Sequence, residues 1–309
     1  MAYNLKEQMS KPERFEAGHR LCAGCGAGIT CRAMMRAMEP GDKAVICNAT
    51  SCLEVSSFQY PFTAWDDSYI HAAFENTSAV AAGVESAYKI MKKKGKIQDN
   101  FKILAIGGDG GTYDIGFQSL SGALERGHDF TYFCYDNEAY MNTGTQRSSA
   151  TPRFASATTT PAGVESVGKK QNQKDLTQIV VAHGSPYVAQ TTFLGNFKDF
   201  HEKAHKAIYT EGPTFVNVLC PCPRGWQYSA ELLPEICRLA VDTCIWPLYE
   251  VENGEYHLTY MPKKKLPVEE FMKLQGRFRH CFKPGNEWTI EAAQNYVDEK
   301  WEALLAKCK

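Results

Sequence analysis

The stretch that most constrains the fold of this chain is residues 103–142, in which two apolar runs flank a glycine-rich turn. The first run, 103–106, has the composition of a buried parallel strand. It breaks at Gly107–Gly111, and a helical pattern over 114–125 leads to a second expected strand at 130–135. This succession is typical of a doubly wound α/β fold, in which ligands bind at the carboxyl edge of a parallel sheet.

Two oxygen-bearing side chains, Asp109 and Asn137, follow these strands and stand 28 residues apart. Because both come at carboxyl ends of strands, we expect both to face the ligand-binding crevice. Glycines let backbone N–H groups approach an anion closely, and the next helix offers further donors to a phosphate. Hard oxygen ligands beside a phosphate suit Mg²⁺. The simpler alternative is a glycine turn that Asp109 merely caps.

The bulk composition limits the class of protein. The 309 residues can form one large domain or two modest ones. A net charge of −1 with 22% charged residues gives no indication of nucleic-acid or membrane binding. No apolar run approaches the roughly 20 residues of a transmembrane helix. The polar N-terminus carries both charge signs and is no signal peptide, so a cytoplasmic location is expected.

Twelve cysteines are many for a chain with no export signal, so we expect metal or cluster ligation for some and burial for the rest. Cys22 and Cys25 form a CxxC among small residues. Four interpretations are open: a redox dithiol, half a zinc site, half an iron–sulfur site, or packing. Metal or cluster binding is favoured, since no strand precedes the motif as in thioredoxin-like proteins.

Two further cysteines are expected at the carboxyl edge of the sheet. Cys52 comes just after a short expected strand at 43–48. Cys222 follows the expected strand at 214–219 and is flanked by prolines that fix the backbone. Cys222 is the preferred ligand of this segment, and Cys220 is the alternative.

The chain divides into an expected N-terminal extended arm at 1–20, a main domain at 21–245 and a C-terminal arm at 246–309. A loop of roughly 30 residues follows Asn142, and a loop of that length is usually functional or mobile. The Asn253-Gly254 pair predicts a hairpin. Apolar periodicity predicts a further strand at 187–191 and helices at 29–38, 74–92, 175–183, 196–209, 229–243 and 289–306.

Six segments together resemble the beta subunit of the pyruvate:ferredoxin oxidoreductases, or 2-oxoacid:ferredoxin oxidoreductases. They are GHRLCAGCG (18–26), SCLEV (51–55), WDDSYIHAAFEN (65–76), GDGGTYDIG (108–116), YDNEAYMNTG (135–144) and PCPRGW (221–226). They span most of the chain in the family's order and include a segment similar to the thiamine diphosphate (ThDP) signature. The resemblance implies a doubly wound, mostly parallel α/β sheet of the ThDP diphosphate-binding type with a C-terminal extension.

The resemblance also implies which residues form the site. Mg²⁺ would be bound by Asp109, Asn137 and the backbone carbonyl of Ala139. Asn142 would be the catalytic residue of this chain, beside the thiazolium and the substrate. A [4Fe–4S] cluster close to ThDP would be held by Cys22, Cys25, Cys52 and Cys222. The residues expected to bind the cofactor are Cys52, Gly108, Asp109, Gly110, Gly111, Asn137, Ala139, Tyr140 and Asn142.

The implied activity is that of an anaerobic 2-oxoacid:ferredoxin oxidoreductase. Such enzymes oxidatively decarboxylate a 2-oxoacid on ThDP and pass electrons singly through the cluster to ferredoxin. Pyruvate, with coenzyme A as acyl acceptor, is favoured; oxalate without coenzyme A, or a branched-chain 2-oxoacid, is the alternative. A cluster-free ThDP decarboxylase or synthase half would not need cysteines at three strand-edge positions. A structural zinc module would favour paired CxxC knuckles, and this chain has one.

Two parts of the family's machinery are missing from this sequence: the domain with the carboxylate that faces the aminopyrimidine ring of ThDP, and a CxxCxxCxxxCP run. The resemblance therefore implies an alpha subunit that supplies the pyrimidine-side domain, and a ferredoxin-like cluster subunit or domain. An external ferredoxin would accept the electrons, and a dimer of heteromers is expected. This chain alone is expected to be inactive.

Two places depart from the family pattern. Many relatives have an acidic residue where this chain has Ala27, and the polar pair Asp66-Asp67 replaces a more apolar pair expected in pyruvate enzymes. Both departures would suit an unusual substrate such as oxalate, although two acidic residues facing the pocket would repel a dianion.

Overall fold

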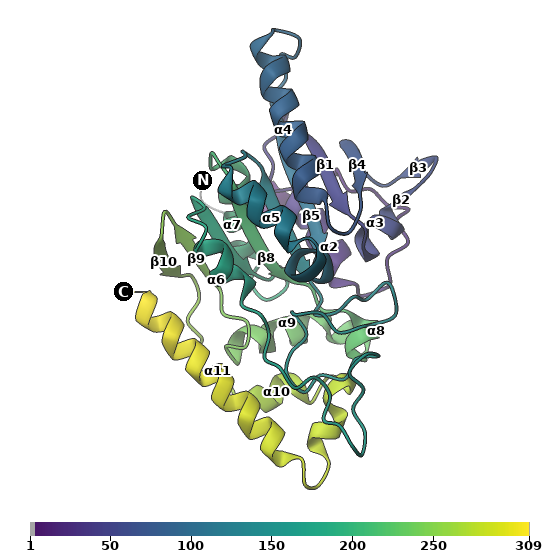
Figure 1. Cartoon of the computed structure of the whole chain (residues 1–309), viewed down its shortest axis with the longest axis vertical. Helices are drawn as coiled ribbons and strands as arrows, with labels where there is room; N and C mark the ends of the chain where they lie inside the picture. The colour runs from purple at the N-terminus through teal and green to yellow at the C-terminus, as the bar shows by residue number, and fades with distance from the viewer. Residues whose placement is uncertain (1–3, 309) are drawn as a thin grey trace.

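An eight-stranded sheet with helices on both faces organises residues 4–308, which a computed structural model describes (Figure 1). The strand order is β10-β9-β7-β8-β6-β5-β1-β4. The strands from β7 to β4 are parallel, whereas β9 pairs antiparallel with β7, and β10 with β9. The predicted doubly wound, mostly parallel α/β fold is confirmed. The bounds are β1 Lys43–Ala49, β4 Ser68–Ala72, β5 Phe101–Gly108, β6 Thr131–Asp136, β7 Tyr187–Thr191, β8 Thr214–Leu219, β9 Tyr249–Glu252 and β10 Glu255–Leu258.

Both faces of the central strands are buried, because successive side chains of a strand point to opposite faces. Ile46 and Phe133 enter the core shared with α2 and α7, whereas Cys47 and Cys134 enter the core shared with α4, α5 and α6. The helix bounds are α1 Leu5–Ser10, α2 Gly26–Met35, α3 Cys52–Ser57, α4 Thr77–Lys93, α5 Phe117–Glu125, α6 Leu176–Val181, α7 Phe197–Tyr209, α8 Pro223–Trp226, α9 Leu233–Asp242, α10 Val268–Met272 and α11 Glu287–Lys307.

The sheet continues into the segment expected as a C-terminal arm. The predicted hairpin is present as β9 and β10, and Asn253 and Gly254 at its turn have φ of 50° and 87°. Beyond it, α10, η3 (Gly276–Phe282) and α11 pack with α9 around a further core. In Figure 1, α11 lies along the outside of this C-terminal region. The segment thus packs on its own chain, and the boundary at 246 stays a prediction.

The N-terminal segment also contacts its own chain. The expected extended arm is wrong for residues 5–10, which form α1, and residues 1–3 lie outside the described part. Phe15 is 2% exposed, and its ring centroid lies 4.8 Å from that of Trp65. Burial of an aromatic ring against the main domain fixes this segment in place.

Several elements near the sheet edge differ from expectation. Helix α2 begins three residues early, because Cys25 forms its N-cap. The helix expected from residue 114 begins instead as a π-helix, η1 (Gly110–Ile115), and continues as α5. Short α3, β4 and the β2–β3 hairpin (Phe58–Gln59 with Phe62–Thr63) lie where only an aromatic-rich segment was recognised. Such short elements give weak periodic signals.

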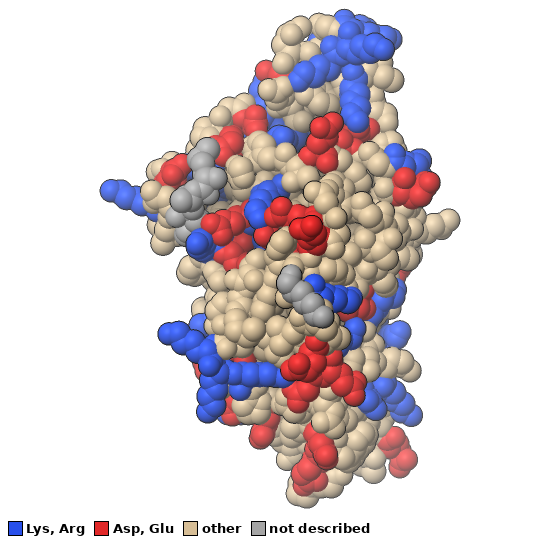
Figure 2. Space-filling model, turned by 90° about the vertical axis from the view of Figure 1, so that its left-hand side faces the viewer, with Lys and Arg blue, Asp and Glu red and all other residues tan. Residues whose placement is uncertain are grey.

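The outer surface carries both signs of charge. Acidic and basic side chains alternate over much of the face in Figure 2, with basic side chains gathered at the upper end, where Figure 1 shows the tip of α4. That tip carries the exposed Lys92, Lys93 and Lys94. Within residues 4–308, none of the helices has the length and apolarity needed to cross a membrane.

Candidate functional site

The carboxyl ends of β5 and β6 bring Asp109 and Asn137 together. The two strands are parallel neighbours with Gly108 opposite Tyr135, so the residues that follow them emerge side by side. The backbone N–H of Asn137 donates to Asp109 Oδ1 at 3.4 Å, and both side chains are buried. The 28-residue spacing thus closes into a direct contact.

Three oxygen-bearing groups converge at this contact. The amide end of Asn137 lies 2.9 Å from Asp109 Oδ1 and 2.9 Å from the carbonyl oxygen of Ala139. With its nitrogen toward them, the amide would donate a hydrogen bond to both; with its oxygen toward them, three hard oxygen ligands would face a common point. Burial raises the pKa of the Asp109 carboxyl. A bound cation would oppose this effect, because a positive charge stabilises the carboxylate. This donor set fits Mg²⁺.

A glycine cradle lies beside these oxygens. A Cβ on Gly110 would come 2.4 Å from the ring of Tyr140, and one on Gly111 would come 3.0 Å from the carbonyl oxygen of Phe74. The Tyr140 hydroxyl donates to the Gly110 carbonyl at 2.9 Å, which holds the ring there. Only glycine lets the backbone pass so close to these groups, which leaves its N–H groups accessible to an anion.

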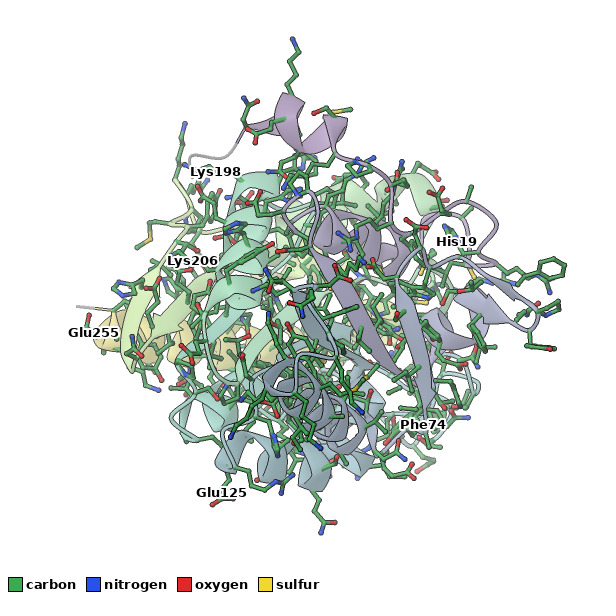
Figure 3. The ribbon with its side chains drawn as sticks, turned by 90° about the horizontal axis from the view of Figure 1, so that it is seen from above. His19, Phe74, Glu125, Lys198, Lys206 and Glu255 are labelled. Carbon is green, nitrogen blue, oxygen red and sulfur yellow. The ribbon has the colours of Figure 1, made fainter. Side chains whose placement is uncertain are left out.

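One shallow pocket at this edge is lined by all nine residues that the sequence predicted for cofactor binding. Thr50, Ser51, Phe74, Met141 and Thr143 also line it, although sequence analysis did not single them out. In the view from above, Phe74 lies on the opposite side of the molecule from Glu255 of β10 (Figure 3).

The long loop after Asn142 folds back onto this site. The Ser148 hydroxyl donates a short hydrogen bond to Asp109 Oδ2, and the Thr151 hydroxyl donates to the carbonyl of Glu138 at 2.6 Å. The buried Lys169 ammonium donates to the carbonyl oxygens of Ser149 and Thr151. The loop is therefore anchored on the site. Ser148 could not be predicted as a site residue, because a single serine 39 residues from Asp109 belongs to no recognisable sequence motif.

The CxxC segment packs against the segment that holds Cys222. A Cβ on Gly26 would lie 2.8 Å from the carbonyl carbon of Cys220, and the Gly26 N–H donates to the Pro221 carbonyl at 3.2 Å. Cys25 is the N-cap of α2 and Cys222 that of α8. Both thiols therefore face helix N-terminal N–H groups, which favour a thiolate.

The four predicted cluster ligands are close enough for the charge of one thiolate to affect the pKa of another. Burial raises the pKa of the Cys25 and Cys52 thiols most, and the negative charges of the Cys222 and Cys22 thiolates raise both pKa values further. Backbone N–H groups of Ala27 and Gly28 favour the Cys25 thiolate, and the Gly225 N–H donates to Cys222 Sγ at 3.4 Å.

Cys220 has a different environment. It is 1% exposed, and its thiol donates to the Thr30 hydroxyl at 3.4 Å. Burial raises the pKa of this thiol well above its usual range. These are the properties of a cysteine packed in the core, whereas Cys222 is half-buried beside the other three.

Across residues 4–308, no three or more His, Cys, Asp or Glu side chains have the spacing to hold a single metal ion. The predicted magnesium ligands are of another kind, because they comprise one carboxylate, one amide and one carbonyl. A [4Fe–4S] cluster is larger than a single ion, so its cysteine ligands stand further apart than those of a mononuclear site.

Comparison with known proteins gives consistent results. Residues 21–218 match the thiamine pyrophosphate enzyme family, C-terminal TPP binding domain. The chain is 52% identical to pyruvate synthase subunit PorB of Methanocaldococcus jannaschii, over 96% of this chain and 98% of that protein. It is 49% identical to the same subunit of Thermotoga maritima, over 99% and 96%. It is 44% identical to ketoisovalerate oxidoreductase subunit VorB of Pyrococcus furiosus, over 97% and 96%.

The chain belongs to the ThDP-binding beta subunits of the 2-oxoacid:ferredoxin oxidoreductases.

The beta-subunit fold is also found in a solved structure. A 2-oxoglutarate:ferredoxin oxidoreductase from Magnetococcus marinus superposes with a TM-score of 0.56 at 22% identity, over 73% of this chain and 79% of that chain. At that identity the likeness concerns the fold alone. The relatives with 49–52% identity show that this beta subunit is part of an oxidoreductase, as its sequence predicted.

The two departures from the beta-subunit pattern have structural explanations. Asp67 accepts hydrogen bonds from Arg14 and from the backbone N–H of Ala44, and it does not line the pocket. The neighbouring Asp66 is exposed. Ala27 is buried in the first turn of α2, where its N–H faces Cys25. The interpretation of Asp66 and Asp67 as substrate-selecting residues is not supported.

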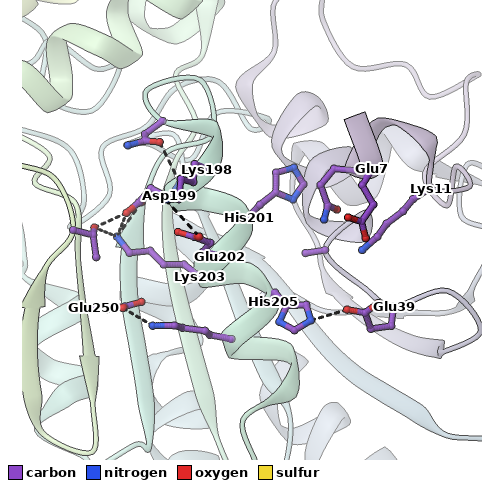
Figure 4. A pocket seen from close by; sticks show the side chains of 15 residues that line it. Glu7, Lys11, Glu39, Lys198, Asp199, His201, Glu202, Lys203, His205 and Glu250 are labelled. Carbon is purple, nitrogen blue, oxygen red and sulfur yellow. Dashed lines mark hydrogen bonds and ion pairs between the residues drawn. The ribbon is translucent and has the colours of Figure 1, made fainter. Parts of the chain in front are cut away.

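A second hollow of the beta subunit lies between α1 and α7 (Figure 4). Several of its charged side chains form ion pairs. Lys203 contacts Asp199 at 2.9 Å, and Lys206 contacts Glu250 at 2.6 Å. Because these charges are already compensated, the hollow has a structural rather than a catalytic character.

Proposed function

We propose that this chain is the ThDP-binding subunit of a cytoplasmic pyruvate synthase, which oxidatively decarboxylates pyruvate in the presence of coenzyme A and delivers the electrons to ferredoxin. The observation that carries the proposal is the pocket at the carboxyl edge, because the nine residues expected from the family motif line it together. The names of the relatives with 49–52% identity favour pyruvate as the substrate.

In this proposal Asp109, Asn137 and the Ala139 carbonyl bind Mg²⁺, and the glycines of 107–111 receive the diphosphate. The convergent oxygens and the close approach of Tyr140 to Gly110 support this assignment. ThDP supplies a carbon nucleophile that can accept the electrons left when CO₂ departs. Asn142, which is exposed at the mouth of the pocket, would orient the substrate.

Cys22, Cys25, Cys52 and Cys222 are the proposed ligands of a [4Fe–4S] cluster, which supplies a one-electron acceptor. The mutual effects of their charges support these four as ligands, and the burial of Cys220 in the core argues against Cys220 as the fourth ligand. Cys52 also lines the cofactor pocket, so this set would place the cluster next to ThDP.

The alpha subunit would complete the active site. The exposure of Asn142 at the pocket leaves this side open to a second protein surface, which would supply the pyrimidine-side carboxylate. A ferredoxin-like cluster subunit or domain would carry the electrons onward to external ferredoxin. A dimer of such heteromers is the proposed assembly.

The test is an assay of the complex purified without oxygen, with ferredoxin reduction as the readout. Pyruvate should be turned over only with coenzyme A. A branched-chain 2-oxoacid is the second candidate substrate, because a ketoisovalerate oxidoreductase subunit is 44% identical. Faster turnover of 2-ketoisovalerate than of pyruvate would reassign the substrate. Oxalate turnover without coenzyme A would contradict the proposal.

A further inference from the structure

A buried arginine of the C-terminal region contacts the loop that carries the magnesium ligands. Arg277, in η3, is 2% exposed. It donates to Glu138 Oε2 at 2.5 Å and to Gln275 Oε1 at 2.8 Å. Glu138 stands between the proposed ligands Asn137 and Ala139, with a left-handed φ of 63°. A non-glycine residue holds this conformation only when its surroundings enforce it, and the ion pair does so here.

The same arginine contacts the helix that carries Cys222. Its guanidinium lies 3.8 Å from the ring centroid of Trp226, at the end of α8. The Trp226 indole N–H donates to the Asn137 carbonyl at 2.8 Å. Helix α8 is only one turn long and has Cys222 as its N-cap, so Arg277, Trp226 and Cys222 form one compact unit next to the magnesium loop.

The buried charge of Arg277 therefore lies beside the one-turn helix whose N-cap is Cys222. The Gly225 N–H of the same helix donates to Cys222 Sγ at 3.4 Å, so the surroundings of this sulfur favour negative charge. Inside a protein, charges interact more strongly than in water because the dielectric constant is low. Arg277 has therefore more influence on this site than an exposed arginine would have.

We propose that Arg277 raises the reduction potential of the cluster bound by Cys222. This inference rests on the proposed function, because it requires the cluster at that cysteine. Reduction adds one electron to the cluster, and a buried cation nearby stabilises the added negative charge. Arg277 is thus a positioning residue that keeps the cluster a competent acceptor for electrons from the neighbouring ThDP site.

The experiment is a redox titration, followed by electron paramagnetic resonance, of the complex purified without oxygen. Arg277→Gln removes the charge, and Arg277→Lys keeps it. Because Arg277→Gln leaves Glu138 as an unpaired buried charge, the double variant Arg277→Gln/Glu138→Gln replaces the pair by two neutral amides, a change that proteins tolerate better. Arg279→Gln is the matched control, since Arg279 is exposed in the same segment.

We expect the potential of this cluster to become more negative in Arg277→Gln and in the double variant, since both remove the buried positive charge beside the helix that Cys222 caps. Arg277→Lys and Arg279→Gln should stay close to wild type, and clusters of other subunits should not shift. An unchanged potential in a double variant with wild-type iron content would overturn the inference. If Cys222→Ser removes no iron from the complex, the proposed cluster assignment itself fails, and this inference with it.

Discussion

Asp67 accepts two hydrogen bonds from the guanidinium of Arg14, at 2.8 and 2.5 Å, and thereby ties the N-terminal segment to the start of β1. Its Oδ1 also accepts the N–H of Ala44 at 2.9 Å. The pair is mostly shielded from solvent, with side-chain exposures of 13% and 6%. A residue that departs from the family pattern therefore has a role in stability, at the start of β1 and β4 and outside the lining of the pocket.

This relationship predicts that Asp67→Asn destabilises the protein without changing its substrate preference. Loss of a charge-assisted pair should lower the free energy of unfolding by about 2 kcal/mol. Asp66→Asn, at an exposed neighbour, should change it by less than about 0.5 kcal/mol. Urea unfolding measures the stability, and the ratio of pyruvate to oxalate turnover measures the preference. A changed ratio in Asp67→Asn would mean that this residue does affect substrate selection.

The glycine cradle predicts a specific effect of one added methyl group. In Gly110→Ala the new Cβ would meet the Tyr140 ring at 2.4 Å, so the ring and the magnesium loop must shift. Overpacking of this kind costs about 1–3 kcal/mol, which corresponds to a loss of ThDP affinity of roughly 5- to 150-fold.

The control for this variant is Gly83→Ala, on an exposed position of α4 where a Cβ meets nothing within 4 Å. It should stabilise the helix by about 0.5–1 kcal/mol and leave ThDP affinity unchanged. Calorimetric titration of the complex with ThDP and Mg²⁺ tests both variants. Equal affinities for the two would mean that the diphosphate binds elsewhere.

The two cysteines of the 220–222 segment should behave differently on substitution. Cys222→Ser should lose the iron bound by this chain, because it removes a proposed ligand. Cys220→Ser should keep the iron, since Cys220 is buried against Thr30 and a serine hydroxyl can replace its hydrogen bond. Iron content and the visible spectrum of complexes purified without oxygen give the answer. The reverse pattern would identify Cys220 as the ligand.

His201 predicts a loss of stability in mild acid. Burial, and then the charges of Lys11 and Arg36, lower its pKa to about 4 in the folded protein; Figure 4 shows it in the hollow between α1 and α7. In the unfolded chain the pKa of a histidine is about 6.5. As pH falls from about 6.5 to 4, the unfolded chain therefore takes up a proton that the folded chain does not, and stability decreases.

We expect His201→Gln to reduce the difference in unfolding free energy between pH 7.5 and pH 5 by about 2 kcal/mol. Urea unfolding at both values measures this difference, and the value at pH 7.5 separately gives the structural cost of the substitution. A variant with the same pH dependence as wild type would mean that His201 is protonated in the folded protein.

The sequence by itself determined the fold class and the family, and its resemblance to that family implied the nine residues that line the pocket. The fold class follows from local patterns: apolar runs form buried strands, and the glycine turn and the residues after β6 emerge at one sheet edge because parallel neighbours end together. The Asn253-Gly254 turn was equally predictable from the sequence, because few residue types readily adopt the left-handed backbone conformations that it requires.

Only the tertiary structure decided which distant residues support the site. Ser148 reaches Asp109 across 39 residues, and Arg277 reaches Glu138 across 139. Neither contact produces a periodic pattern in the sequence, because each depends on where a long loop or the C-terminal segment returns to the sheet. The different environments of Cys220 and Cys222 have the same origin. Both follow β8 with almost the same sequence context, and the packing of α2 on that segment leaves Cys220 buried and Cys222 half-buried.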